Sequence, residues 1–170
     1  MAAGGSKSTA TILLILNLVL YFVITVIASW AINHGIERTH ETASVLPIPA
    51  RIFPIYFPVG NMATGFFVIL ALLAGVVGMG TSLTGLSNVS QWNAPNLLAA
   101  ADSSLVTLSL TLFAMGLACK EIQYGWTDSN LRTLEVITIV ASATQLFYTG
   151  AIHAGVGSVS RRPRPYGGRV

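Results

Sequence analysis

Residues 10–32 read ATILLILNLVLYFVITVIASWAI, a run of 23 residues without a charged side chain. A helix needs about 20 consecutive apolar residues to cross the hydrocarbon core of a bilayer, so this run predicts a transmembrane span. It is longer than the apolar region of a cleaved signal peptide, which has about 7–15 residues. We therefore expect a first span that is retained, with Trp30 near the headgroup level.

Three more spans follow from the rest of the chain. No charged residue occurs between Arg51 and Asp102, and the polar cluster 84–96 divides this stretch into two elements. Residues 120–130 read KEIQYGWTDSN and predict a short turn before a last apolar run. The sequence thus predicts an all-α, four-span transmembrane bundle in one domain, residues 1–157, with spans at about 10–32, 61–83, 97–119 and 131–153.

The composition agrees with a membrane protein. Of the 170 residues, 53% are hydrophobic and 9% are charged, whereas soluble proteins carry about 25% charged residues. The formal net charge of +3 does not indicate a nucleic-acid binder, because the positive charge is concentrated in residues 158–170, which we expect to be a disordered basic tail that contacts anionic lipids. The arginines of this tail are Arg161, Arg162, Arg164 and Arg169.

An even number of spans puts both termini on one side of the membrane. That side carries five basic residues, Lys7 and the four tail arginines, and the other side carries four: Arg38, Arg51, Lys120 and Arg132. Because the side with more basic residues stays in the cytosol, both termini are predicted to be cytosolic. The segment 47–58, with four prolines, cannot form a regular helix and is expected to lie on the opposite membrane surface.

Each predicted span carries small or polar residues at steps of three and four, so that they share one helix face. One interpretation is helix–helix packing, in which small residues allow close approach and polar groups form hydrogen bonds. The other is a polar passage or pocket between the helices, favoured by polar groups that are costly in lipid. The candidate polar membrane site consists of Asn17, Asp102, Glu135, Gln145 and His153.

The ionisable members of this candidate site have simpler interpretations as well. Glu135 is expected to form a structural pair with Lys120 or Arg132. Asp102 either favours the positive end of its helix dipole or pairs with His153, which an antiparallel hairpin places about 4–5 Å away along the axis. Such an acid–imidazole pair would serve proton-linked gating at the cytosolic end.

Motifs of catalysis are missing from the sequence. It contains no phosphate-binding GxxxxGK[ST], no GxGxxG, no HExxH and no cysteines or histidines paired at metal-ligand spacing. Its single cysteine, Cys119, excludes an intramolecular disulfide. We therefore expect neither an enzyme nor a cofactor or metal site.

Several stretches together resemble one family, the plant AWPM-19-like plasma-membrane proteins. They are LLILNLVLYFV (13–23), ASWAINHGI (28–36), NMATGFF (61–67), LLAAADSS (97–104), AMGLACKEI (114–122) and QLFYTGAIHAG (145–155). The resemblance covers about residues 10–157 and implies a multi-pass plasma-membrane protein linked to abscisic acid, dehydration, cold and seed maturation.

Two functions follow from the resemblance and the polar stripes. In the first, the protein is expected to facilitate the passage of abscisic acid or another small weak acid, and a carrier of four spans is then expected to be a homo-oligomer. Alternatively, it is a structural or adaptor protein that stabilises the membrane or a membrane-protein partner, without transport activity.

Overall fold

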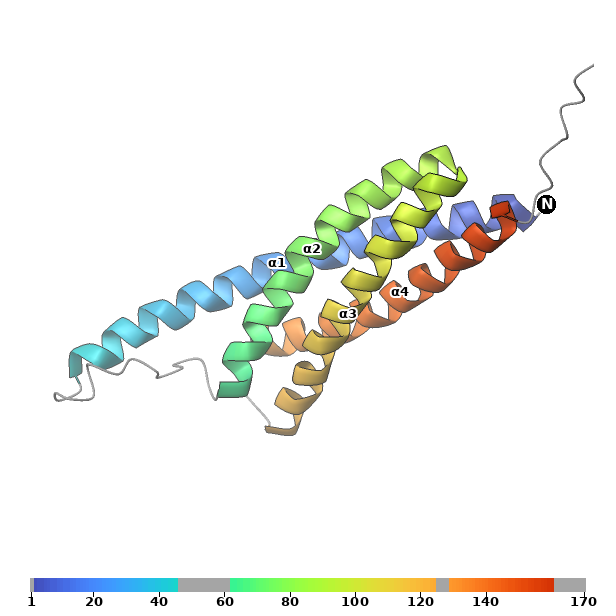
Figure 1. The fold of residues 1–170 in the computed structure, drawn as a ribbon. Helices are drawn as coiled ribbons and strands as arrows, with labels where there is room; N and C mark the ends of the chain where they lie inside the picture. Colours follow the sequence, from blue (N-terminus) through green and yellow to red (C-terminus); the bar gives the residue numbers. More distant parts are fainter. Residues whose placement is uncertain (1, 46–61, 125–128, 161–170) are drawn as a thin grey trace, which may run out of the picture.

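The computed structural model describes residues 2–45, 62–124 and 129–160, which form four helices (Figure 1). They are α1 (Ala2–Val45), α2 (Met62–Gln91), α3 (Ala94–Tyr124) and α4 (Ser129–Ser160). Each is long and apolar enough to cross a membrane. The prediction of an all-α protein with four candidate spans is confirmed.

The helices form a bundle in which each packs against two neighbours: α1 and α3 both contact α2 and α4. The start of α1 lies beside the end of α4 (Figure 1), and Lys7 Nζ donates a hydrogen bond to the carbonyl oxygen of Ser90, at the end of α2. We call this end of the bundle the tail end. The opposite end, where α2 and α4 begin and α3 finishes, is the loop end.

The helices run further than the apolar spans expected from the sequence. Helix α2 continues through most of the polar cluster 84–96, and α3 continues to Tyr124, inside the segment expected to be a turn. Polar side chains at these ends bond to the backbone of their own helix, as Thr84 does to Gly80 and Ser90 to Ser87, so polarity there marks the membrane surface rather than the end of the helix. The segment 47–58 and the tail arginines lie outside the described residues.

Helices α2 and α3 are joined by only Trp92 and Asn93. Trp92 adopts a positive φ of 43°, the left-handed conformation with which many helices end and for which glycine is usual. Asn93 caps α3, because its Oδ1 accepts a hydrogen bond of 3.0 Å from the backbone N–H of Asn96. The joint is therefore a tight hairpin with a defined geometry.

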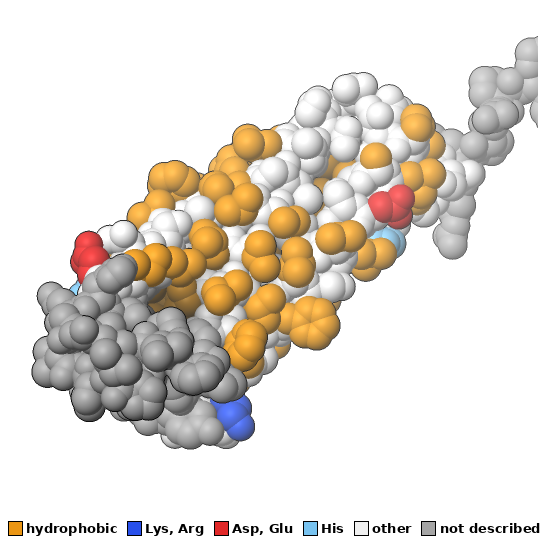
Figure 2. Space-filling view, turned by 60° about the vertical axis from the view of Figure 1, so that its left-hand side comes forward, with side chains coloured by type: hydrophobic (Ala, Val, Ile, Leu, Met, Phe, Trp, Pro, Cys, Tyr) orange, Lys and Arg blue, Asp and Glu red, His pale blue; other side chains and the backbone are white. Residues whose placement is uncertain are grey.

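Apolar and polar side chains are distributed as lipid surroundings require. Large apolar side chains cover the outside of the bundle, with Phe113 66% and Phe147 68% exposed. The visible face carries hydrophobic side chains along its length, and its acidic and basic side chains lie toward the two ends (Figure 2). In water such a surface would aggregate, whereas in a bilayer it contacts acyl chains.

Helices α1 and α2 approach closely where glycines face an aromatic ring. A Cβ atom on Gly78 would collide with the ring of Tyr21, and one on Gly75 would press on the backbone of α1 at Thr25 and Tyr21. Small residues permit this contact between helix backbones, which in lipid is a main source of association. The small-residue stripe of the second span is thus used for packing.

Candidate functional site: a polar column through the bundle

The interior of the bundle contains buried polar side chains among its apolar ones. None of those named below is more than 4% exposed, although they come from all four helices. We call them the polar column; from the loop end to the tail end they are Thr64, Glu121, Glu135, Thr138, Ser142, Thr111, Tyr21, Thr107, Gln145, Asn17 and Ser104.

In the middle of the column, Tyr21 reaches diagonally across the bundle from α1 to α3. Its hydroxyl lies 2.9 Å from Oγ1 of Thr111. The Thr111 hydroxyl donates to the carbonyl oxygen of Thr107 at 2.7 Å, so the tyrosine is the donor in the first bond. Ser142 on α4 lies against the same turn, with its Oγ 3.4 Å from the carbonyl oxygen of Thr111.

One turn further toward the tail end, an amide pair connects three helices. Asn17 Nδ2 donates to Gln145 Oε1 at 2.9 Å, and Gln145 Nε2 donates to the carbonyl oxygen of Ser104 at 3.2 Å. The predicted site residues Asn17 and Gln145 are therefore brought together. The Oδ1 of Asn17 is buried and has no hydrogen-bond partner in the part of the chain that the structure describes.

Two carboxylates occupy the loop end of the column. Glu121 on α3 accepts a hydrogen bond of 2.7 Å from Thr64 Oγ1 through its Oε2. Glu135 on α4 is buried as well, at 4% exposure. Among the described residues no ion pair joins Glu135 to Arg132, so this form of the expected structural pair is not made, and the form with Lys120 stays a prediction.

The structure places Asp102 and His153 outside the column. Both side chains are exposed, and in the part of the chain that the structure describes no hydrogen bond or ion pair joins them. His153 Nδ1 lies 2.8 Å from the carbonyl oxygen of Thr149 in its own helix. From Thr149 the inward face of α4 continues by a step of three to Ile152, which is fully buried, and not by a step of four to His153.

The sequence does not single out Glu121, because it stands in a charged segment that predicts a turn. Thr149 follows Gln145 by four residues and lies on the polar face predicted for the fourth span. Two further polar groups at the tail end are missed by the sequence prediction, the hydroxyl of Tyr148 and Nε1 of Trp92. Among the described residues these two groups and the hydroxyl of Thr149 are buried without a hydrogen-bond partner.

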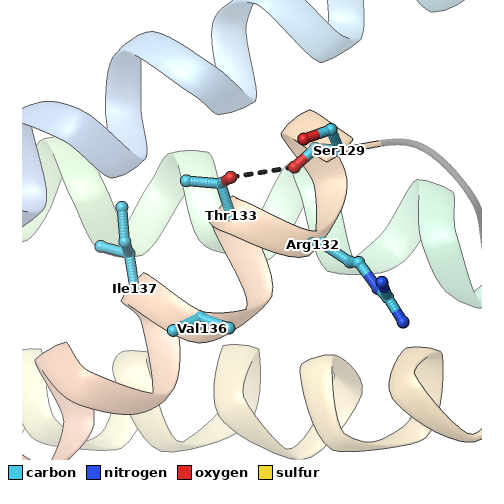
Figure 3. Close-up of a pocket in the computed structure, with 5 residues that line it drawn as sticks. All are labelled: Ser129, Arg132, Thr133, Val136 and Ile137. Atoms are coloured by element: carbon cyan, nitrogen blue, oxygen red, sulfur yellow. Dashed lines mark hydrogen bonds between the residues drawn. The ribbon is translucent and has the colours of Figure 1, made fainter.

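Two open grooves flank the first turns of α4 on the outside of the bundle. One, of about 290 Å³, is lined by Ser129, Arg132, Thr133, Val136 and Ile137; Figure 3 shows the arginine extending away from the helix and the hydrogen bond from Thr133 to Ser129. The other, of about 310 Å³, is lined by Val26, Ile27, Trp30 and Asn130. Neither includes a residue of the polar column.

The described residues contain no group of three or more histidine, cysteine, aspartate or glutamate side chains that could hold a metal ion. What the column offers instead is a file of hydroxyl, amide and carboxyl groups, from one end of the bundle toward the other. Such groups can form hydrogen bonds to a polar molecule, or they can form hydrogen bonds to one another.

Comparison with known proteins gives two matches. The model of the AWPM-19-like family matches residues 15–155. The membrane protein PM19L of Oryza sativa subsp. japonica is 38% identical over 157 residues, which cover 92% of this chain and 83% of the rice protein. No solved structure matches the chain.

Proposed function

Because this chain belongs to the AWPM-19-like family of membrane proteins, we propose that it acts at the plant plasma membrane in abscisic-acid-linked responses to dehydration, cold and seed maturation. There it facilitates the passage of a small weak acid such as abscisic acid. The observation that carries this proposal is the polar column, which runs through an otherwise apolar bundle.

The physical reason lies in the cost of dehydration. A carboxylic acid that enters an apolar interior loses its hydrogen bonds to water, at about 1–3 kcal/mol for each unpaired group. The interior offers replacements, including groups that have no hydrogen-bond partner among the described residues: Oδ1 of Asn17 in the column, and the hydroxyls of Tyr148 and Thr149 at the tail end. A bundle of four spans is small for a carrier, so the proposal includes a homo-oligomer.

The experiment is uptake of labelled abscisic acid into liposomes that contain the purified protein, compared with empty liposomes from mildly acidic to mildly alkaline pH. The empty liposomes give the passive rate of the protonated acid. We expect faster uptake with the protein. Thr138→Val, which removes a hydroxyl from the column, should slow it, whereas Thr133→Val, the same change at an exposed site on α4, should not.

A second candidate function is structural, and a separate observation favours it. Several column hydroxyls already donate to a carbonyl of their own helix, as Thr138 does to Leu134 and Thr107 to Ser103, so their hydrogens are not available to a ligand. In that case the protein stabilises the membrane or a partner protein during drying. Equal uptake by protein-containing and empty liposomes at every pH would select this function.

A further inference from the structure

Two ionisable side chains near the tail end point out of the bundle. Asp102 on α3 and His153 on α4 are both exposed, and the face drawn in Figure 2 carries an acidic and a histidine side chain toward this end. Within the described residues the carboxylate of Asp102 has no hydrogen bond or ion pair. Ionisable side chains of membrane helices almost always face the interior of a bundle or a water-filled cavity, or pair with another polar group. The outward position of Asp102 therefore requires a partner that its own bundle does not supply.

The position of Asp102 along α3 places it below the membrane surface. Helix α3 has 31 residues, about 46 Å at 1.5 Å per residue, and the hydrocarbon core is about 30 Å thick. A helix of this length that is centred in the membrane extends about 8 Å beyond the core at each end, whereas Asp102 lies about 12 Å after Ala94, the start of α3. The attraction of a helix N-terminus for negative charge ends within the first turn, so it does not account for this position.

Asp102 and His153 lie at similar depths and on the same side of the bundle. The contact of the Ser142 hydroxyl with the carbonyl oxygen of Thr111 sets the register between α4 and α3. From this contact toward the tail end, Asp102 is nine residues away on α3 and His153 is eleven residues away on α4, so their depths differ by about 3 Å. Eleven residues are about three helical turns, and His153 therefore shares with Ser142 the edge of α4 that adjoins α3.

The surroundings of His153 suit the approach of a second helix. Its Nδ1 lies 2.8 Å from the carbonyl oxygen of Thr149. A carbonyl oxygen only accepts, so Nδ1 carries the hydrogen and Nε2 is left to accept a hydrogen bond, or to donate one when the ring is protonated. The neighbouring residues Gly150, Ala154 and Gly157 are small and exposed, and a Cβ atom on either glycine would meet no atom within 4 Å. Such residues let helix backbones come close in lipid.

We propose that this surface, the Asp102–His153 face, is the contact between two copies of the chain. It consists of Asp102, Gly150, His153, Ala154 and Gly157, and Asp102 of each copy bonds to Nε2 of His153 in the other copy. The face is complementary to itself because it carries both an acid and a base, and a two-fold axis along the membrane normal keeps each group at the same depth in both copies. The interface gives a location to the homo-oligomer of the proposed function, but it depends on no transported ligand.

The test measures association of the full-length protein in liposomes. Cys119 is the single cysteine and is exposed, so one sample is labelled there with a donor dye and another with an acceptor dye. Energy transfer between copies, followed as the lipid-to-protein ratio is raised, gives the dissociation constant of the dimer. The variants are Asp102→Asn and His153→Asn, and the matched control is Glu37→Gln, which removes an exposed carboxylate at the loop end.

We expect the wild type and Glu37→Gln to associate equally. Each variant of the face should raise the dissociation constant about tenfold, because the dimer loses two hydrogen bonds between helices. The double variant Asp102→His with His153→Asp exchanges acid and base, keeps both pairs and should restore association. All of these side chains are exposed, so the melting temperature of the monomer in detergent should stay unchanged.

A wild type that stays monomeric at every lipid ratio overturns the proposal, and this is the result that a pair within one chain predicts. Association that neither Asp102→Asn nor His153→Asn weakens overturns it as well. The outcome is separate from the uptake experiment, because a dimer with these properties that does not accelerate the uptake of abscisic acid supports the interface and contradicts transport alone.

Discussion

Tyr21 and Tyr148, two tyrosines of the bundle interior, differ in the hydrogen bonding of their hydroxyl groups. The hydroxyl of Tyr21 bonds to Thr111 at 2.9 Å, whereas the hydroxyl of Tyr148 is buried without a hydrogen-bond partner among the described residues. Both rings are buried, at 0% and 3% exposure. The pair therefore separates the contribution of a hydrogen bond from that of an aromatic ring.

We expect Tyr21→Phe to lower the free energy of unfolding by about 0.6 kcal/mol, and by at most about 1.7 kcal/mol, the range of hydrogen bonds between membrane helices. Tyr148→Phe should cause no loss, because it removes an unsatisfied polar group from the interior. Denaturant unfolding in mixed micelles measures both. An unchanged free energy of unfolding for Tyr21→Phe would show that the diagonal bond contributes nothing, and a clear loss for Tyr148→Phe would show that its hydroxyl has a partner.

At the scale of elements, the contact between α1 and α2 depends on Gly78. Gly78→Ala places a methyl group closer to the ring atoms of Tyr21 than van der Waals contact allows. The helices must then separate or the ring must move. Such overpacking typically costs about 1–3 kcal/mol. We expect a clearly lower melting temperature, measured by thermal unfolding in detergent.

The control for Gly78→Ala is the same substitution at Gly80, two residues further along α2. A methyl group on Gly80 meets no atom within 4 Å, so Gly80→Ala should leave the melting temperature unchanged or raise it slightly, since alanine favours a helix. Equal losses for the two substitutions would mean that the effect belongs to glycine in α2 and not to the contact with Tyr21.

The helices show which parts of the structure the sequence could predict. Apolar runs such as 10–32 are predictable because lipid selects for them along the whole length of a span. The inward faces are predictable too, because the step of 3.6 residues places Thr107 with Thr111 and Thr138 with Ser142, all of them buried.

The helix ends and the partners of individual residues could not be predicted. Hydropathy changes at the membrane surface while the backbone hydrogen bonds continue, so α3 runs past Lys120 to Tyr124. The carboxylate of Glu121 is paired in the interior because the first turn of α2 brings Thr64 to it. Thr64 and Glu121 are 57 positions apart in the sequence, so no local sequence pattern predicts their contact.

For the molecule as a whole, the arrangement of the helices puts both ends of the described chain at the tail end (Figure 1). The side of the membrane on which they lie stays a prediction from the basic residues, namely the cytosol. In a Cys119→Ser background, which removes the single cysteine, Val170→Cys should react with a membrane-impermeant maleimide only after the cells are permeabilised. Labelling of intact cells would invert the topology.

The joint of two residues between α2 and α3 also bears on how the protein is made. Two helices held by Trp92 and Asn93 cannot be released into the lipid far apart from each other. Helix α3 is less apolar than α2. Its inward threonines bond to carbonyls of α3 itself and also to neighbouring helices, as Thr107 does to Ser103 and with Thr81. During biosynthesis α2 and α3 would therefore leave the translocation channel together. The more apolar α2 would then favour the insertion of the less apolar α3 into the membrane.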